Sequence, residues 1–258
     1  MFLEGRRLFM INSLIIGYGV VGSQLNRELG KLRSDIYDKY KNMDSRREIV
    51  YDIAFICVDT PKTKTELNDI SEVRNALLEN EADLFVIKSA ILPTASEKLT
   101  KETGKQIVIS PEYYGVTQHS NNYNFDFTIL GGDIKNTSKA QQILQKVFDA
   151  RHRFYHVPFR EAELVKYMEN SWLAYKVSFM HQFKDIADQY EVNYDRLREL
   201  FILDPRVHPS NTFVYNEHEW WESHCYDKDI PAIAEANNAQ LLLDLIKFNE
   251  RRKNTKNN

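Results

Sequence analysis

The segment IIGYGVVG, residues 15–22, constrains the fold of this chain more than any other feature. Gly17, Gly19 and Gly22 follow the spacing G-x-G-x-x-G directly after an apolar run, and a helical run begins within the motif. In such a unit the first glycine permits a tight turn, the second lets backbone approach a pyrophosphate, and the third lets helix and strand pack closely. The motif predicts a dinucleotide-binding turn. The alternative is a glycine turn on a sheet that binds nothing.

Short apolar runs alternate with helical runs over the first 157 residues. Most of the apolar runs are continuous, as expected for strands buried on both faces. We predict seven strands, at residues 13–17, 34–38, 52–58, 83–89, 106–110, 127–132 and 153–157. Helices are predicted at residues 20–32, 69–81, 93–104 and 136–150. The alternation predicts an α/β fold, a Rossmann-like doubly wound parallel sheet that occupies a first domain, residues 1–157.

A long helical run follows Pro158 and predicts a second, α-helical domain, residues 158–258. Residues 160–193 contain no glycine or proline. A helix of about 30 residues spans about 45 Å, so we expect it to link two domains or to carry a homodimer interface. Its apolar residues recur at helical spacing: Leu164, Tyr167, Met168, Trp172, Tyr175, Phe179, Phe183 and Ile186. A short helix at 194–204, a last helix at 230–253 and a disordered tail at 253–258 are predicted after it.

The second predicted strand ends in Asp38, which is placed to accept hydrogen bonds from the adenosine ribose of a dinucleotide. An acidic residue here favours NAD over NADP. Asp35 competes for this role because strand ends are uncertain by a few residues. The alternative is NADP, because Lys39 and Lys41 follow Asp38 and could bind its 2′-phosphate. Val20 and Val21, at the start of the following helix, complete the predicted phosphate-binding turn.

Composition excludes several classes of partner. The formal net charge is −3 and the basic residues are scattered, which argues against nucleic acid. No apolar run approaches the roughly 20 residues that a membrane-spanning helix needs. Two cysteines make no disulfide scaffold, so we expect a reducing, cytoplasmic setting, which would be the host cytoplasm for a viral gene. No metal ligands are assigned.

The segment ESHCYDKDIPAIAE places Cys225 among charged residues just before a helical run. A nearby lysine, Lys228, and a helix N-terminus would both lower the pKa of a thiol, as a nucleophile requires. The alternative is an incidental thiol in a polar loop. Cys57, between Ile56 and Val58, is instead predicted to pack in the core.

Lys166 and Asn170 are four residues apart on the long predicted helix, and therefore lie on one face. An ammonium group and an amide side by side can stabilise a developing oxyanion. A solvated helix face is the alternative interpretation of the same spacing.

The order of these segments resembles the UDP-glucose and GDP-mannose dehydrogenases. The similar segments are IIGYGVVG, YDIAFICVDTP, VIKSAILP, SPEYYG, AELVKYMENSWLAYKVSFMHQF, DPRV and CYDKD, in the order of the family. The resemblance implies that Thr60, Pro61 and Ser89 contribute to the NAD site. It also implies two NAD-dependent oxidations of the C6 alcohol of a nucleotide sugar, such as UDP-glucose, to a carboxylate.

The resemblance assigns roles to the remaining candidates. Cys225 would capture the aldehyde as a thiohemiacetal and then hold a thioester, while Lys166 and Asn170 stabilise the oxyanion. Asp229 would position or accept a proton, and Glu112 is a candidate base for thioester hydrolysis or else a loop carboxylate. Substrate contacts are expected from two residues, Arg206 as a bidentate donor and Lys228 through its charge.

The sequence also departs from the family pattern. The family has a further nucleotide-sugar domain, which this chain, ending at Asn258, is expected to lack. The family's glycine-rich loop ahead of the cysteine corresponds here to HPSNTFVYNEHEWWESHC, without glycine. Trp220 and Trp221 in this stretch are either a stacking platform or core residues. The alternatives to the leading function are a two-electron 3-hydroxyacid dehydrogenase that uses Lys166, and a non-catalytic NAD-binding protein.

Overall fold

The computed structural model describes residues 11–114, 125–215 and 219–256. Gly115, the last residue of the SPEYYG segment, lies outside these ranges. The chain divides into two compact units. The first comprises Met1–Pro61 and Asp69–Lys166, and the second comprises Lys62–Asn68 and Tyr167–Asn258.

An eight-stranded sheet occupies the described part of the first unit, in the order β3-β2-β1-β4-β5-β6-β7-β8. All seven predicted strands are present. The short β3 was not predicted, because two residues carry no periodic pattern. The strands are β1 Ser13–Ile16, β2 Ser34–Asp38, β3 Met43–Asp44, β4 Ile53–Ile56, β5 Phe85–Ile87, β6 Ile107–Ile109, β7 Phe127–Gly131 and β8 Arg153–Val157.

The sheet is mostly, but not wholly, parallel. Five neighbouring strands, in the sheet order β2-β1-β4-β5-β6, run parallel to one another, as predicted. β7 pairs antiparallel with β6 through Ile109 and Gly131, and β3 pairs antiparallel with β2. These two antiparallel pairings are additions to the doubly wound parallel sheet that the sequence predicted. Strand direction depends on the connecting segments, which apolar periodicity does not describe.

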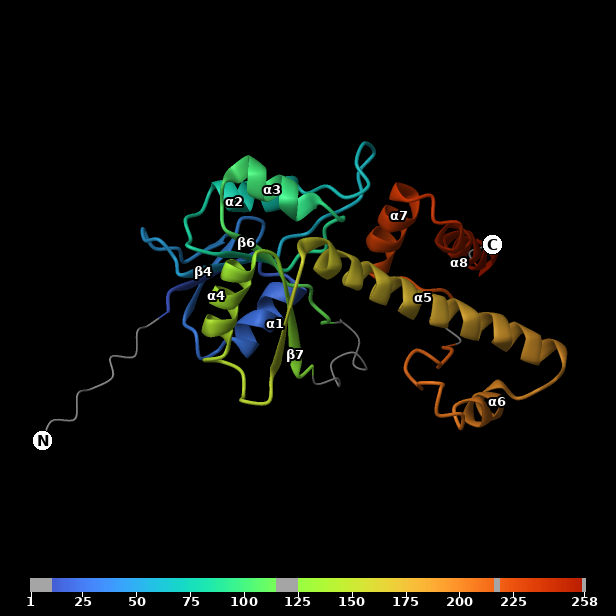
Figure 1. Ribbon diagram of the computed structural model, residues 1–258. Coiled ribbons are helices and arrows are strands. Elements are labelled where there is room, and N and C mark those ends of the chain that lie inside the picture. Colours follow the sequence, from blue (N-terminus) through green and yellow to red (C-terminus); the bar gives the residue numbers. More distant parts are fainter. Residues whose placement is uncertain (1–10, 115–124, 216–218, 257–258) are drawn as a thin grey trace, which may run out of the picture. The chain divides into compact units, whose positions relative to one another are not determined.

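Helices cover both faces of the sheet, which confirms the predicted Rossmann-like α/β fold (Figure 1). Side chains alternate along the strands, so Leu14 and Ile16 enter one core while Ile15 enters the other. The core with Ile15 packs against α1 (Val20–Glu28) and α4 (Ile134–Leu144). The core with Leu14 packs against α2 (Ser71–Leu78) and α3 (Ala95–Thr103).

The second unit is helical. Four helices are described: α5 Phe159–Gln189, which begins in the first unit, α6 Tyr194–Phe201, α7 Tyr226–Ala236 and α8 Gln240–Lys256. The predicted long helix is confirmed, with 31 residues. Among the described residues, no helix combines the length and the hydropathy that a bilayer crossing requires.

Two predictions for the end of the chain are wrong. The single last helix is divided into α7 and α8, because Asn238 adopts a left-handed conformation with φ 49°. Asparagine tolerates this conformation better than most residues. The tail predicted to be disordered from residue 253 is helical as far as Lys256. Its polar composition suggested disorder, but lysine and arginine are themselves good helix formers.

Candidate functional site

The glycine turn lies between β1 and α1. Gly17 has φ +87°, and a Cβ there would lie 2.7 Å from the carbonyl oxygen of Cys57. A Cβ on Gly22 would lie 1.9 Å from the carbonyl oxygen of Gly17. A Cβ on Gly19 would meet no heavy atom within 4 Å. Two glycines are therefore required by the fold itself, while the open side of Gly19 leaves room for a ligand to approach the backbone, as a pyrophosphate does.

Val20 and Val21 are the first two residues of α1. Gly19 is the N-cap residue, and no side chain caps this helix. The first backbone N–H groups of a helix have no partner within it, and the helix dipole favours a negative charge at this end. The turn and the helix start therefore fit the phosphate groups of a dinucleotide.

Asp38 is the last residue of β2, and only 8% of its surface is exposed. Its Oδ2 accepts a hydrogen bond from the N–H of Tyr18, inside the glycine turn, at 2.7 Å. Its Oδ1 accepts from the N–H groups of Tyr40 and Lys41, both at 3.0 Å. A carboxylate offers about four acceptor positions. Asp38 therefore braces the glycine turn and retains one position for a ribose hydroxyl.

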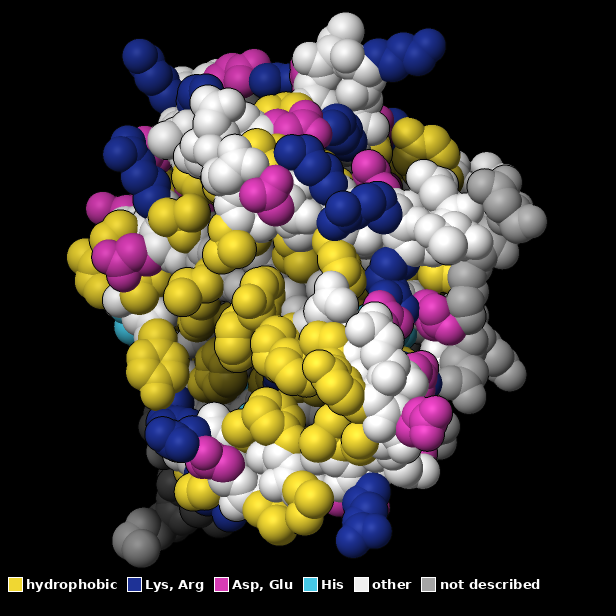
Figure 2. Space-filling model, turned by 90° about the vertical axis from the view of Figure 1, so that its right-hand side faces the viewer, with side chains coloured by type: hydrophobic (Ala, Val, Ile, Leu, Met, Phe, Trp, Pro, Cys, Tyr) yellow, Lys and Arg dark blue, Asp and Glu magenta, His cyan; other side chains and the backbone are white. Residues whose placement is uncertain are grey.

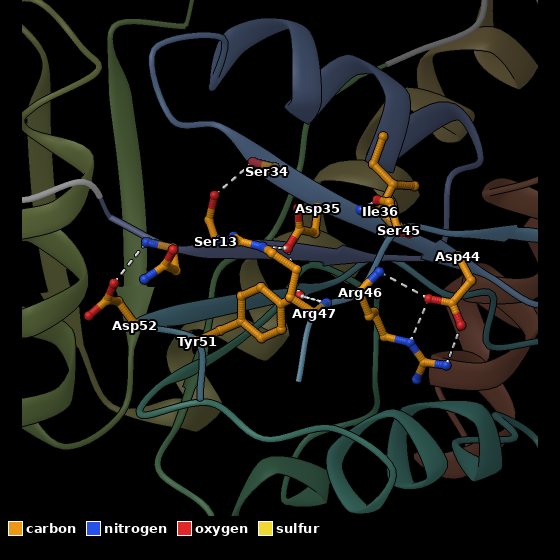
Figure 3. Close-up of polar contacts among 11 residues, drawn as sticks. Ser13, Ser34, Asp35, Ile36, Asp44, Ser45, Arg46, Arg47, Tyr51 and Asp52 are labelled. Atoms are coloured by element: carbon orange, nitrogen blue, oxygen red, sulfur yellow. Dashed lines mark hydrogen bonds and ion pairs between the residues drawn. The ribbon is translucent and has the colours of Figure 1, made fainter. Parts of the chain in front are cut away.

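Asp35 has a different environment. Its Oδ2 accepts hydrogen bonds from Nε of Arg47 and from the hydroxyl of Tyr51, both at 2.7 Å (Figure 3). It precedes Asp38 by three residues of the same strand, which is about 10 Å at the usual rise. The two candidates for the ribose role are thus distinguished, since only Asp38 is bonded to the glycine turn.

The two lysines that could bind a 2′-phosphate each have a partner within the chain. Lys39 Nζ lies 2.6 Å from a carboxylate oxygen of Glu72, and Lys41 Nζ donates to the carbonyl of Tyr18 at 2.7 Å. The hydrogen bond with Glu72 raises the pKa of Lys39. Lys39 is thus paired with a residue of α2, whereas Lys41 is bonded to the glycine turn, and the preference for NAD over NADP stays a prediction.

Thr60, Pro61 and Ser89 follow β4 and β5 at the carboxyl edge of the sheet. The hydroxyl of Thr60 donates to the carbonyl of Ala90 at 2.7 Å, and the hydroxyl of Ser89 donates to the carbonyl of Val58 at 2.5 Å. Both side chains are buried, whereas Pro61 is exposed. The two hydroxyls hold the loops together, and a role of the three residues in cofactor binding stays a prediction.

A buried ion pair joins Glu112 to Lys88, which the sequence reasoning did not assign. Their side chains are 12% and 6% exposed, and Lys88 Nζ also donates to the hydroxyl of Ser110 at 3.0 Å. Burial raises the pKa of Glu112, while the charge of Lys88 and, more weakly, that of Lys166 oppose this shift. One signal could have found Lys88: it is a cation at the end of an otherwise apolar run, DLFVIKS.

Lys166 belongs to the same environment as Glu112. Its Nζ lies 5.1 Å from the centre of the Tyr113 ring, and its charge acts on the carboxyl group of Glu112. Lys166 precedes Asn170 by one helical turn of α5. The structure thus brings two of the predicted catalytic side chains, Lys166 and Glu112, into one electrostatic environment.

Asp229 is the centre of a second cluster. Only 2% of its surface is exposed. Its Oδ2 accepts a hydrogen bond from Nδ2 of Asn170 at 2.8 Å, and its Oδ1 accepts from Nζ of Lys228 at 2.7 Å. Cys225 is the exposed N-cap residue of α7, and its carbonyl accepts from the N–H of Asp229 at 2.9 Å. A hydrogen bond between α5 and α7 therefore joins Asn170 to a cluster of three predicted site residues that are close together in the sequence, Cys225, Lys228 and Asp229.

Arg206 and the two tryptophans lie in other surroundings. The guanidinium of Arg206 is 2.6 Å from a carboxylate oxygen of Asp204, and its side chain is 88% exposed. Trp221 is 5% exposed and donates its ring N–H to the hydroxyl of Ser178 at 3.1 Å. Trp221 is therefore a core residue and no stacking platform. The ring N–H of Trp220 donates to Glu222 at 3.2 Å.

The fold and the glycine turn place the first unit in the Rossmann-like class of α/β proteins. Residues 160–252 match the model of the UDP-glucose/GDP-mannose dehydrogenase family, central domain. The resemblance inferred from the sequence is confirmed: over these residues the chain is similar to the UDP-glucose/GDP-mannose dehydrogenase family.

The similar proteins include two curated relatives. UDP-glucose 6-dehydrogenase of Rickettsia prowazekii is 25% identical over 209 residues, which cover 76% of this chain and 47% of the relative. UDP-N-acetyl-D-mannosamine dehydrogenase of Methanococcus vannielii is 25% identical over 232 residues, which cover 85% of this chain and 53% of the relative. The chain thus spans about half the length of these relatives.

A solved structure supports the fold. The UDP-glucose dehydrogenase of Pyrobaculum islandicum superposes with a TM-score of 0.77 at 21% identity, covering 97% of this chain and 70% of that chain. At this identity the likeness concerns the fold alone.

Proposed function

We propose that this protein oxidises the C6 alcohol of a nucleotide sugar, of the UDP-glucose type, to the carboxylate with NAD as the oxidant. The observation that carries the proposal is the cluster around Asp229, in which Asn170 and Lys228 bind one buried carboxylate a helical turn from Cys225. The similarity of residues 160–252 to the dehydrogenase family supports the reaction class.

The residues of the first unit fit NAD. The open side of Gly19, the uncapped start of α1 and the remaining acceptor position of Asp38 suit a pyrophosphate and a ribose. NAD, when bound, would accept hydride from the sugar carbon.

The protein side chains would perform the remaining chemistry. The sulfur of Cys225 would bond to the aldehyde carbon, so that the second oxidation leaves a thioester for water to hydrolyse. Lys166 and Asn170 would donate hydrogen bonds to the developing oxyanion. Asp229 would orient the Asn170 amide, and Glu112, held next to Lys88, would accept a proton from the hydrolytic water.

The test follows the absorbance of NADH with a panel of UDP- and GDP-sugars, and counts NADH per sugar. We expect two NADH per sugar from the unmodified protein and at most one from Cys225→Ala. Cys57→Ala is the matched control, because Cys57 is buried in the core of the first unit. Full stoichiometry from Cys225→Ala would refute the covalent mechanism, and one NADH independent of Cys225 would indicate two-electron chemistry. NAD binding without NADH from any sugar would indicate the non-catalytic alternative.

We also propose that the protein forms a homodimer through α5. Along the part of α5 in the second unit, Met168, Trp172, Tyr175, Phe179 and Phe183 are spaced on one helix face and are 36–76% exposed. Figure 2 shows hydrophobic side chains gathered on the face that holds the end of α5, with α6 and α8. Exposed apolar patches of this kind mark interaction surfaces, and one self-complementary helix face suits a two-fold axis.

Sedimentation velocity tests the dimer. We expect Phe179→Glu to convert a dimer into a monomer at micromolar concentration. The control is Leu78→Glu, which charges a 56% exposed apolar residue on α2. A monomer for the unmodified protein would refute the proposed dimer.

A further inference from the structure

Glu163, near the start of α5, is a buried carboxylate that binds the backbone of another element. Only 2% of its surface is exposed. Its Oε2 accepts a hydrogen bond from the N–H of Thr94, and its Oε1 accepts from the N–H of Ser96, both at 2.9 Å. Burial raises the pKa of Glu163, and the hydrogen bonds from Ser96 and Thr94 oppose this shift. Both carboxylate oxygens are thus directed at the short turn from which α3 begins.

The backbone of Thr94 is strained. Thr94 is the N-cap residue of α3 and has the left-handed conformation, with φ 80°. For a residue with a branched Cβ this conformation is costly, because the side chain meets the backbone. A strained residue of this kind persists only where its surroundings enforce the conformation. The hydrogen bond from the Thr94 N–H to Glu163 is a contact that does so.

The turn at Thr94 ends a loop that carries candidate site residues. The loop begins after β5 with Lys88, the ion-pair partner of Glu112. In its middle, the carbonyl of Ala90 accepts a hydrogen bond from the hydroxyl of Thr60 at 2.7 Å. Glu163 therefore fixes the far end of a loop whose near end contributes to the environment of Glu112.

The start of α5 is itself held in a defined place. A Cβ on Gly131, at the end of β7, would lie 2.4 Å from the Cβ of Ala162, so the helix approaches the sheet closely at this point. Lys166 follows Glu163 by three residues and lies on the same face of α5. The bonds of Glu163 to the turn thus act one helical turn before Lys166.

We propose that Glu163 is a positioning residue, whose carboxylate holds the strained turn at Thr94 and, through the same bonds, sets the place of Lys166. This inference rests on the proposed function, in which Lys166 donates a hydrogen bond to the developing oxyanion. Loss of the two backbone bonds would displace the ammonium group of Lys166 without removing it. A displacement of about 1 Å in a catalytic group can reduce the rate about a hundredfold.

The kinetic test compares Glu163→Gln with the unmodified protein. Glutamine keeps the size of the side chain but replaces one acceptor oxygen by an amide group. Because Lys166 would act on the transition state, we expect kcat to fall about tenfold or more. The KM values for NAD and for the sugar nucleotide should change less than about twofold. Arg160→Gln breaks an exposed ion pair of α5 with Glu97 of α3, and as the matched control it keeps kcat.

A second substitution separates positioning from a general loss of packing. Glycine adopts the left-handed conformation without a clash, so the turn in Thr94→Gly no longer needs Glu163 to enforce it. The double variant Glu163→Gln/Thr94→Gly should therefore recover most of kcat and melt at a higher temperature than Glu163→Gln. If Glu163→Gln does not fold, a folded double variant supports the proposal and an unfolded one overturns it.

A spectroscopic measurement tests the position of Lys166 without enzyme activity. Nζ of Lys166 lies 5.1 Å from the centre of the Tyr113 ring, so the ring current shifts the signals of the neighbouring methylene group. In nuclear magnetic resonance spectra of lysine-labelled protein, this signal is assigned by its loss in Lys166→Arg. We expect it to move in Glu163→Gln and to return in the double variant.

The two measurements distinguish the proposals. Absence of NADH from the unmodified protein with every sugar nucleotide refutes the proposed function, and the Lys166 signal then decides the positioning role alone. That role is overturned if the signal in Glu163→Gln stays where it is in Arg160→Gln. It is also overturned if the double variant has no higher kcat than Glu163→Gln.

Discussion

The buried pair of Lys88 and Glu112 makes a prediction that depends on no assumed activity. The change is Lys88→Met, which keeps the length of the side chain and removes its charge. The carboxyl group of Glu112 would then remain at the ends of β5 and β6 without its main cationic partner. We expect a large loss of stability in the first unit.

The magnitude follows from the burial of the pair. The two side chains are 6% and 12% exposed, so solvent screens their interaction little. Removing one partner of such a pair costs about 3–5 kcal/mol. For a unit of this size each kcal/mol lowers the melting temperature by about 2–4 °C. The first unit of Lys88→Met should therefore melt about 6–20 °C lower at neutral pH.

The pH dependence provides a second measurement. Burial already raises the pKa of Glu112, and losing Lys88 raises it further. The stabilising effect of a carboxyl group with a raised folded-state pKa is complete below its unfolded pKa and is lost as the pH rises through the folded value. The deficit of Lys88→Met should therefore be smaller at about pH 5 than at about pH 8.

Calorimetric melting of four proteins tests the predicted loss of stability in Lys88→Met. They are the unmodified chain, Lys88→Met, the double variant Lys88→Met/Glu112→Gln, and the control Lys139→Met, which breaks an exposed pair with Asp83. The double variant should regain most of the loss, and the control should change stability by less than about 1 kcal/mol. A loss in Lys88→Met no greater than in the control, and independent of pH, would refute the reasoning.

Three further outcomes are expected. Gly22→Ala should unfold or strongly destabilise the first unit, because its Cβ would lie 1.9 Å from the carbonyl oxygen of Gly17; a melting temperature unchanged within about 2 °C would contradict this. Asn170→Ala should cost about 1–3 kcal/mol in urea unfolding, since buried Asp229 loses one of its donors; an unchanged midpoint would show that water replaces the amide. Glu163→Ala should increase hydrogen exchange at the start of α3, whose N–H groups its carboxylate accepts at 2.9 Å, and equal exchange would disprove that role.

Local patterns predicted the elements of the first unit well. Each strand from β4 to β6 is a run of apolar residues buried on both faces, so its identity depends little on its neighbours. The same patterns failed at β3 and at the division between α7 and α8. The strand β3 has only two residues, too few to show an alternation of apolar and polar side chains. Asn238, in the left-handed conformation, ends α7 although the apolar spacing of the sequence continues through it.

The candidate site could be predicted only in part. Cys225, Asn170 and Asp229 were found because the family motifs run in order along the chain. Their hydrogen bonds could not be predicted, because Asn170 and Asp229 are 59 residues apart and meet only when α5 and α7 pack. Lys88 was not assigned for the same reason, since its partner follows a different strand.

By itself, the sequence determined most of the segments that become strands and helices, where the glycine turn lies, and which family the chain resembles. These properties depend on residues that are near one another along the chain. The tertiary structure decided that Asp38 and not Asp35 braces the glycine turn, that Glu112 is paired with Lys88, and that Glu163 binds the turn before α3. The physical reason is that desolvation and charge pairing depend on what surrounds a side chain in space, which packing alone establishes.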